Sequence, residues 1–179
     1  MTYAQLPSIQ RVFLESIVSS SDPDGRFVEV NGIQTFYKLA IPQNHMKLLQ
    51  NQQLIPNEPS KPVILLLHQI LGNQYTWRNH LQPLANATGC HVVAYDRPTF
   101  GFTERPTQWE EGKNPYTQEA SVEFVAQFIN ILGYEGKKIV FVGVSSGAAI
   151  SCGFAIRYPH LVHSLCLLAP PLRPEDQGK

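Results

Sequence analysis

The chain has 179 residues, 43% of them hydrophobic, which is enough to build the core of one ordinary domain. Fourteen basic residues balance fourteen acidic ones, so neither nucleic acid nor an anionic membrane is an expected partner. A small, near-neutral substrate is expected instead. No apolar run approaches the roughly 20 residues that cross a bilayer, and the N-terminus lacks a signal-peptide pattern, which favours a cytoplasmic location.

The cysteines Cys90, Cys152 and Cys166 are widely spaced, and none belongs to a Cys-x-x-Cys pair of the kind that binds zinc or carries redox chemistry. We expect them to be buried small side chains in a reducing compartment, and we expect no metal and no cofactor. A nucleotide-binding domain is also disfavoured, because no glycine-rich phosphate loop follows the first predicted parallel strand.

The first part of the chain contains an arm, a hairpin and a polar insertion. Residues 1–25 form the arm, with a short amphipathic helix predicted at 9–18 and a Ser/Asp/Pro/Gly breaker after it. Alternating runs at 26–30 and 33–40 are separated by Asn31-Gly32, a strong signal for a hairpin of two antiparallel strands. Residues 42–62 are rich in proline, glutamine and asparagine, which predicts a loop inserted at the sheet edge, with one helical turn at 45–50.

The rest of the chain alternates between strands and helices. Residues 63–67 are a continuous apolar run, typical of a strand that is buried on both faces. Further strands are predicted at 91–95, 138–144 and 162–168, and helices at 77–87, 117–132 and 146–158. This alternation predicts an α/β fold with a mostly parallel, doubly wound sheet, preceded by the antiparallel hairpin.

The segment Gly143-Val144-Ser145-Ser146-Gly147 lies where a β-branched strand passes directly into an alanine-rich helix. A serine on so sharp a turn takes a strained backbone conformation, and Gly143 and Gly147 remove side chains that would clash. The Ser145 hydroxyl is then exposed at the carboxyl edge of the sheet, beside the N–H groups of a helix N-terminus. The alternative interpretation is a glycine-rich turn with an ordinary serine N-cap.

Two other loops leave the sheet at the same edge. The first loop, at 67–73, follows the buried strand, and the backbone N–H of Ile70 in it is the natural second donor to an oxyanion. The second, at 93–106, contains Asp96 and Arg97. The three loops together predict one site.

The strand ending in His68, the Asp-Arg-Pro-x-Phe-Gly segment at 96–101 and the elbow at 143–147 resemble the α/β-hydrolase superfamily in order and separation. They look most like its broad group of single-domain bacterial and plastid-type hydrolases. The likeness runs from about residue 26 to residue 171. At Gln69 the sequence departs from the pattern, since the family typically has glycine there; we expect this side chain to strain the loop or narrow the pocket.

The resemblance implies roles for individual residues. Ser145 is the expected nucleophile, and the amides of Ser146 and Ile70 are the expected oxyanion donors. His68, Asp96 and Arg97 are expected to shape the loops, and for His68 this structural role is preferred over proton transfer.

The base and acid that would activate Ser145 have no clear candidate. In this fold the histidine comes last in the chain, after the acid. Three histidines adjoin the starts of predicted strands, at the wrong edge, and two others lie on the helix at 77–87 and in the insertion. These are His91, His160, His163, His80 and His45. Glu175 and Asp176 are the candidates for the acid, in a polar tail at 172–179.

The resemblance implies that a complete member would continue for two more strand–helix units, so residues 26–171 are expected to be a partial domain that lacks the last strands. A gene fragment, a split product and one half of an assembly all remain open. Our first hypothesis is a serine-type hydrolase that cleaves an ester, amide or related acyl bond through an acyl-enzyme. The alternative is a non-catalytic remnant that binds a small ligand, or a partner chain along the exposed last strand.

Overall fold

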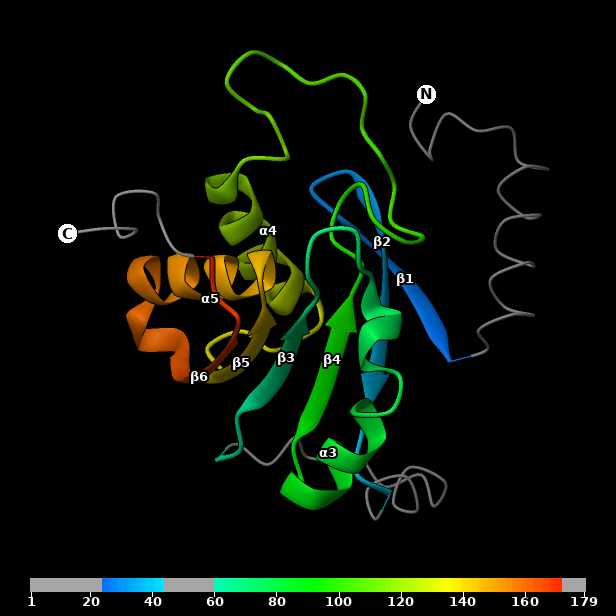
Figure 1. The fold of residues 1–179 in the computed structure, drawn as a ribbon, viewed down its shortest axis with the longest axis vertical. Coiled ribbons are helices and arrows are strands. Elements are labelled where there is room, and N and C mark those ends of the chain that lie inside the picture. The colour runs from blue at the N-terminus through cyan, green and yellow to red at the C-terminus, as the bar shows by residue number, and fades with distance from the viewer. Residues whose placement is uncertain (1–23, 44–59, 172–179) are drawn as a thin grey trace.

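The computed structural model of this protein describes residues 24–43 and 60–171. The predicted helix at 9–18, the predicted turn at 45–50 and the polar tail at 172–179 lie outside these residues. The described part is one six-stranded sheet with helices on both of its faces (Figure 1). None of its helices has the length and apolar content needed to span a membrane.

The sheet has the strand order β1-β2-β4-β3-β5-β6. Strands β1 (Gly25–Val30) and β2 (Ile33–Ala40) form the predicted antiparallel hairpin, and β2 also pairs antiparallel with β4. The other pairs are parallel, as the fold class predicts. The parallel strands are β3 (Val63–Leu67), β4 (His91–Tyr95), β5 (Ile139–Val144) and β6 (Val162–Leu168).

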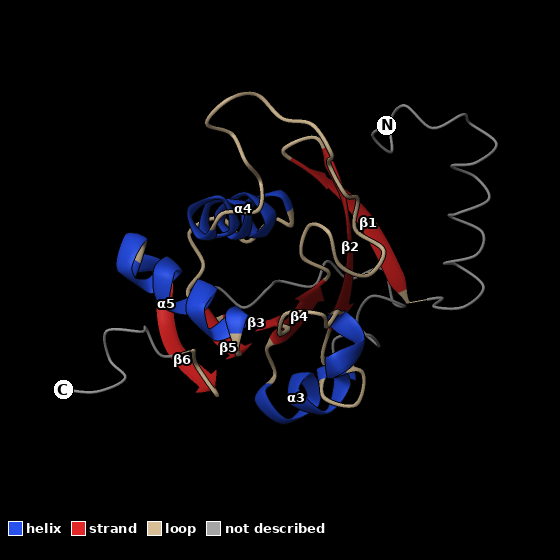
Figure 2. Ribbon diagram, turned by 45° about the horizontal axis from the view of Figure 1, so that its top comes forward, coloured by secondary structure: helices blue, strands red, loops and turns tan. Residues whose placement is uncertain are grey.

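Helices cover both faces of the sheet (Figure 2). Helix α3 (Leu81–Thr88) packs on one face, whereas α4 (Gln118–Ile131) and α5 (Ser146–Arg157) pack on the other. Each face therefore has its own apolar cluster, and every residue of β3 is buried between the two. The continuous apolar run at 63–67 reflects this position, because a strand covered on both faces has no solvent side.

Two details differ from the predictions. The helix predicted from residue 77 begins at Leu81, because Asn73 caps a separate 3₁₀ helix, η2 (Gln74–Trp77), by accepting a hydrogen bond from the backbone N–H of Tyr75. The expectation of three buried cysteines is also wrong. Cys166 is exposed, because it lies on β6, an edge strand of the described sheet.

The carboxyl ends of the four parallel strands share an unusual backbone feature. Each strand is followed, within four residues, by a non-glycine residue with positive φ. These residues are Leu71 (60°), Thr99 (79°), Ser145 (52°) and Ala169 (46°). Strained conformations of this kind persist where the surrounding structure imposes them, and they gather at functional sites. The carboxyl edge is therefore where the fold concentrates its strain.

Candidate active site at the carboxyl edge

Ser145 occupies the sharp turn between β5 and α5. Its φ of 52° and ψ of −119° lie outside the regions that a serine ordinarily adopts. Its backbone N–H donates to the carbonyl of Leu168 at 2.9 Å, and its carbonyl accepts from the N–H of Ala148 at 2.9 Å. The residue is half-buried, and its side chain makes no capping hydrogen bond to the helix. This is not the geometry of an ordinary serine N-cap, whose side chain accepts from the first turn.

The two elbow glycines lie where no side chain fits. A Cβ atom on Gly147 would lie 2.4 Å from the carbonyl oxygen of Leu67, and one on Gly143 would lie 2.6 Å from the carbonyl oxygen of Gly147. Both clashes are with backbone, which cannot rotate away. The glycines therefore let the start of α5 approach the end of β3 closely enough to turn the chain at Ser145.

His68 is fully buried beneath the loops. Its Nδ1 is 2.8 Å from the carbonyl oxygen of Gln69, and its Nε2 is 3.1 Å from the backbone nitrogen of Arg97. An N–H can only donate, so Nε2 is the acceptor and Nδ1 carries the proton. Burial, helped by the positive charge of Arg97 and opposed by the hydrogen bond to the Gln69 carbonyl, lowers the pKa of His68 to about 4. His68 is thus a neutral link between two loops.

Asp96 is also buried and links the same loops. Its carboxylate accepts from the backbone N–H of Gln74 at 2.6 Å and from that of Phe102 at 2.8 Å, while its carbonyl accepts from the Thr103 hydroxyl at 2.6 Å. A Cβ on Gly101 would lie only 1.9 Å from this carboxylate. Asp96 therefore holds together the loop that follows β3 and the loop that follows β4.

The loop after β3 contains Gln69 and Ile70. The N–H of Gly72 donates to the carbonyl of Gln69 at 3.0 Å, which closes a tight turn with Leu71 at its positive φ. The Gln69 side chain folds back over this turn, so that a Cβ on Gly72 would lie 2.9 Å from its Cδ. The side chain thus fills part of the loop. Ile70 projects outward, 62% exposed.

The side chain of Arg97 reaches helix α5. Its guanidinium Nη2 donates to the Ser146 hydroxyl at 3.0 Å, and its Cζ lies 5.0 Å from the centre of the Phe100 ring. Burial lowers the pKa of Arg97 below its ordinary value. The side chain thereby ties the loop after β4 to the first residue of α5.

These elements enclose a pocket with a volume of about 330 Å³, beside the elbow. Ile70, residues 97–100 and Ser146 line it, so the structure brings the two predicted oxyanion donors and Arg97 to one space. His68 and Asp96 are fully buried and do not line it. A pocket of this size suits a small molecule.

Sequence reasoning missed one wall of this pocket. Tyr116, from the long loop after β4, and Gln118 and Ser121, from the start of α4, also line it. No local pattern marks these residues, because they have no motif spacing relative to the elbow. Only the packing of α4 against α5 brings them to it.

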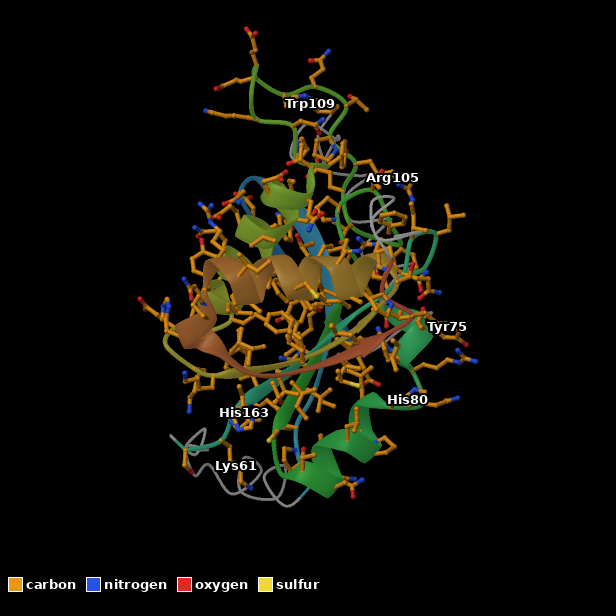
Figure 3. All side chains as sticks on the ribbon, turned by 60° about the vertical axis from the view of Figure 1, so that its left-hand side comes forward. Lys61, Tyr75, His80, Arg105, Trp109 and His163 are labelled. Carbon is orange, nitrogen blue, oxygen red and sulfur yellow. The ribbon has the colours of Figure 1, made fainter. Side chains whose placement is uncertain are left out.

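The histidines predicted to lie far from Ser145 lie at the amino ends of the strands. His91 opens β4, and His163 lies at the start of β6, where Figure 3 shows it near Lys61 and on the side away from Tyr75 and Arg105. Among the residues that the structure describes, no histidine or carboxylate lines the pocket. In the same part of the chain, no group of three or more His, Cys, Asp or Glu side chains could hold a metal ion.

A family model described as the alpha/beta hydrolase fold matches residues 62–178, which is well over half of the chain. The chain belongs to the α/β-hydrolase family. The match spans all of the parallel strands and the elbow, so the hydrolase family expected from the three ordered motifs is confirmed.

Individual relatives have different activities in their names. Epoxide hydrolase 3 of Xenopus tropicalis is 32% identical over 110 residues, which are 62% of this chain and 28% of that protein. Monoacylglycerol lipase ABHD6 of Homo sapiens is 29% identical over 110 residues, 62% of this chain and 31% of that protein. The chain thus spans less than a third of these curated relatives.

A solved structure shows the same arrangement. An epoxide hydrolase from Vigna radiata superposes with a TM-score of 0.63 and 26% sequence identity, covering 84% of this chain and 39% of that one. This likeness supports the arrangement of the sheet and its covering helices. The α/β-hydrolase fold is therefore seen both in the sequence comparison and in three dimensions.

Proposed function

We propose that this α/β-hydrolase is of the serine type and cleaves an ester, amide or related acyl bond of a small substrate. One observation carries the proposal: Ser145 has a strained backbone (φ 52°, ψ −119°) at the strand–helix junction, directly before a residue that lines the pocket. Strain at a half-buried serine in this position is the property of a nucleophile elbow.

The chemistry follows from the groups around Ser145. Its Oγ would attack the carbonyl carbon and give up its proton to a base, and the carbonyl π electrons would move onto the oxygen. The backbone N–H groups of Ser146 and Ile70, which make no hydrogen bond within the described residues, would donate to that oxyanion. Collapse of this intermediate expels the protonated alcohol or amine, and water then releases the acyl group from Ser145.

The proposed substrate bond is an acyl bond, whereas the names of the relatives include both epoxide and lipid hydrolysis. Relatives named as epoxide hydrolases and as a lipase share this fold, so the family alone does not choose between epoxide and acyl substrates. A serine hydroxyl at the elbow favours acyl transfer, because its covalent product is an ester that water can hydrolyse. Uptake of the serine proton needs a base, for which the pocket lining offers no candidate within the described residues.

A fluorophosphonate probe tests the proposal, because it phosphonylates activated serines. We expect labelling of the folded protein, lost in Ser145→Ala and kept in Ser164→Ala, which removes an exposed serine on β6. Folding of each variant is checked by circular dichroism. Labelling that persists in Ser145→Ala, or no labelling of the folded wild type, would overturn the proposal.

A second candidate function is non-catalytic binding of a small ligand or a partner chain. It is favoured by β6, which pairs only with β5 among the described strands and exposes Leu165 and Leu168. An open strand edge offers unpaired N–H and C=O groups to another chain. A folded protein that resists the fluorophosphonate and elutes as a larger complex in size-exclusion chromatography would favour this candidate over the hydrolase.

A further inference from the structure

Among the residues that the structure describes, Arg97 is a buried cation without a matching anion. Arg97 is only 9% exposed, yet it lines the pocket. Within residues 24–43 and 60–171, no carboxylate lies within ion-pair distance of its guanidinium. Removing an unpaired charge from water is costly, and proteins normally supply a partner for it. The lack of an ion-pair partner for the Arg97 guanidinium among these residues therefore calls for an explanation.

The guanidinium also has unused hydrogen-bond donors. Of its five N–H groups, one donates to the Ser146 hydroxyl, whereas Nε is buried and has no acceptor among the described residues. Contact with the Phe100 ring holds the guanidinium in place without offering it an acceptor. The side chain is thus oriented, charged and short of acceptors.

The N-terminus of α5 adds positive potential at the same point. Ser146 is the first residue of this twelve-residue helix, whose first turn contains no acidic side chain. A helix N-terminus stabilises anions through its free N–H groups and its dipole. None of the residues that line the pocket is acidic, so within the described structure no lining charge opposes Arg97.

We propose that this pocket binds a small organic molecule through a single carboxylate, with Arg97 as its ion-pair partner and the apolar body of the ligand against Ile70, Phe100 and Tyr116. The guanidinium matches a carboxylate in shape and charge. A phosphate dianion is disfavoured, because Arg97 is the one cation among the described residues that line the pocket. The inference rests on the proposed function in one respect: it makes the substrate an acyl compound that also carries a free carboxylate, such as a monoester of a dicarboxylic acid.

Binding to the Ser145→Ala protein tests the inference without any turnover. Isothermal titration compares 4-phenylbutyrate with 4-phenylbutyramide, which has the same shape without the charge. We expect the acid to bind about tenfold tighter or more, since charge-assisted hydrogen bonds exceed neutral ones. Equal affinity for acid and amide, or no binding of the acid, would overturn the inference whatever the variants do.

Variants then assign the preference to Arg97. Adding Arg97→Met should abolish the preference for the acid and leave the amide affinity within about twofold, whereas Arg97→Lys should keep part of the preference. Arg78→Met, which removes an exposed arginine outside the lining, is the matched control and should keep all of it. A preference that survives in folded Arg97→Met contradicts the assignment. If that variant does not fold, the Lys variant and the acid–amide comparison decide.

The two proposals can fail separately. The fluorophosphonate test depends on Ser145 and not on the acid, whereas the titration is done without Ser145. A folded protein that binds the acid through Arg97 but resists the probe would keep the carboxylate site and lose the hydrolase. Labelling at Ser145 without any preference for the acid would keep the hydrolase and lose the carboxylate site.

Discussion

The backbone N–H of Arg97 donates to Nε2 of His68 across 3.1 Å, and this bond joins the loops that leave β4 and β3. It requires an unprotonated Nε2, so a charged His68 would break the link. The histidine of the first motif therefore acts as a structural element whose neutrality is part of the fold, and not as a group placed to accept the proton of Ser145.

Acidification should destabilise the protein through His68. Its pKa is about 4 in the folded protein and about 6.5 when unfolded, so between these values the unfolded state binds the extra proton. The stability linked to this group is fully present above pH 6.5 and is lost as the pH falls toward 4. From pH 7 to pH 5 we expect a loss of about 2 kcal/mol in the free energy of unfolding, measured by urea denaturation.

His68→Gln, which can still donate and accept, should flatten this pH dependence even if it lowers the overall stability. His163→Gln, at an exposed position, should leave it as steep as in the wild type. An unchanged slope in His68→Gln would show that other groups cause the acid sensitivity.

Gly147→Ala should destabilise the fold by about 3 kcal/mol or more, because its Cβ would lie 2.4 Å from the backbone oxygen of Leu67. The same substitution at Gly153, on the same helix, would meet the side chains of Val122 and Gln118 at 2.9 and 3.4 Å. Gln118 can rotate away, whereas the buried, β-branched Val122 shifts only at a cost; because both contacts are with side chains and alanine favours the helix, we expect a loss of about 1–2 kcal/mol, smaller than at Gly147. The midpoints of urea denaturation measure the stability loss in both variants. Similar losses at the two positions would refute the role given to the backbone clash.

Asp96→Asn should loosen the loops around the pocket. The substitution replaces one of two acceptor oxygens by an NH₂ group that faces a backbone N–H donor, from Gln74 or Phe102. A loss of about 1–3 kcal/mol is expected in the free energy of unfolding. Glu110→Gln, in an exposed ion pair with Lys113, should cost less than about 0.5 kcal/mol. Equal costs for the two substitutions would mean that Asp96 does not hold the loops.

Much of the fold could be predicted from local patterns. The continuous apolar run of β3, the Asn31-Gly32 turn and the alternation of strands with helices each appear in the structure within one or two residues. The start of α3 could not be placed, because Asn73 and the residues after it form a 3₁₀ turn that hydrophobic spacing does not distinguish from a helix. The exposure of Cys166 depends on which strands flank β6, and that is not a local property.

The sequence by itself determined the elbow. A β-branched strand, two glycines and an alanine-rich helix mark the turn at Ser145, and Gly143 acts locally because it clears the backbone of Gly147, whereas Gly147 clears the distant backbone of Leu67. Tertiary structure alone decided that Arg97 lies against Ser146, 49 residues away, that Tyr116 and α4 complete the pocket, and that His68 is neutral. These properties depend on burial and on contacts between distant segments, which hydrophobic periodicity does not encode. For that reason the sequence predicts a nucleophile, whereas the ligand charge that we propose rests on contacts found only in the fold.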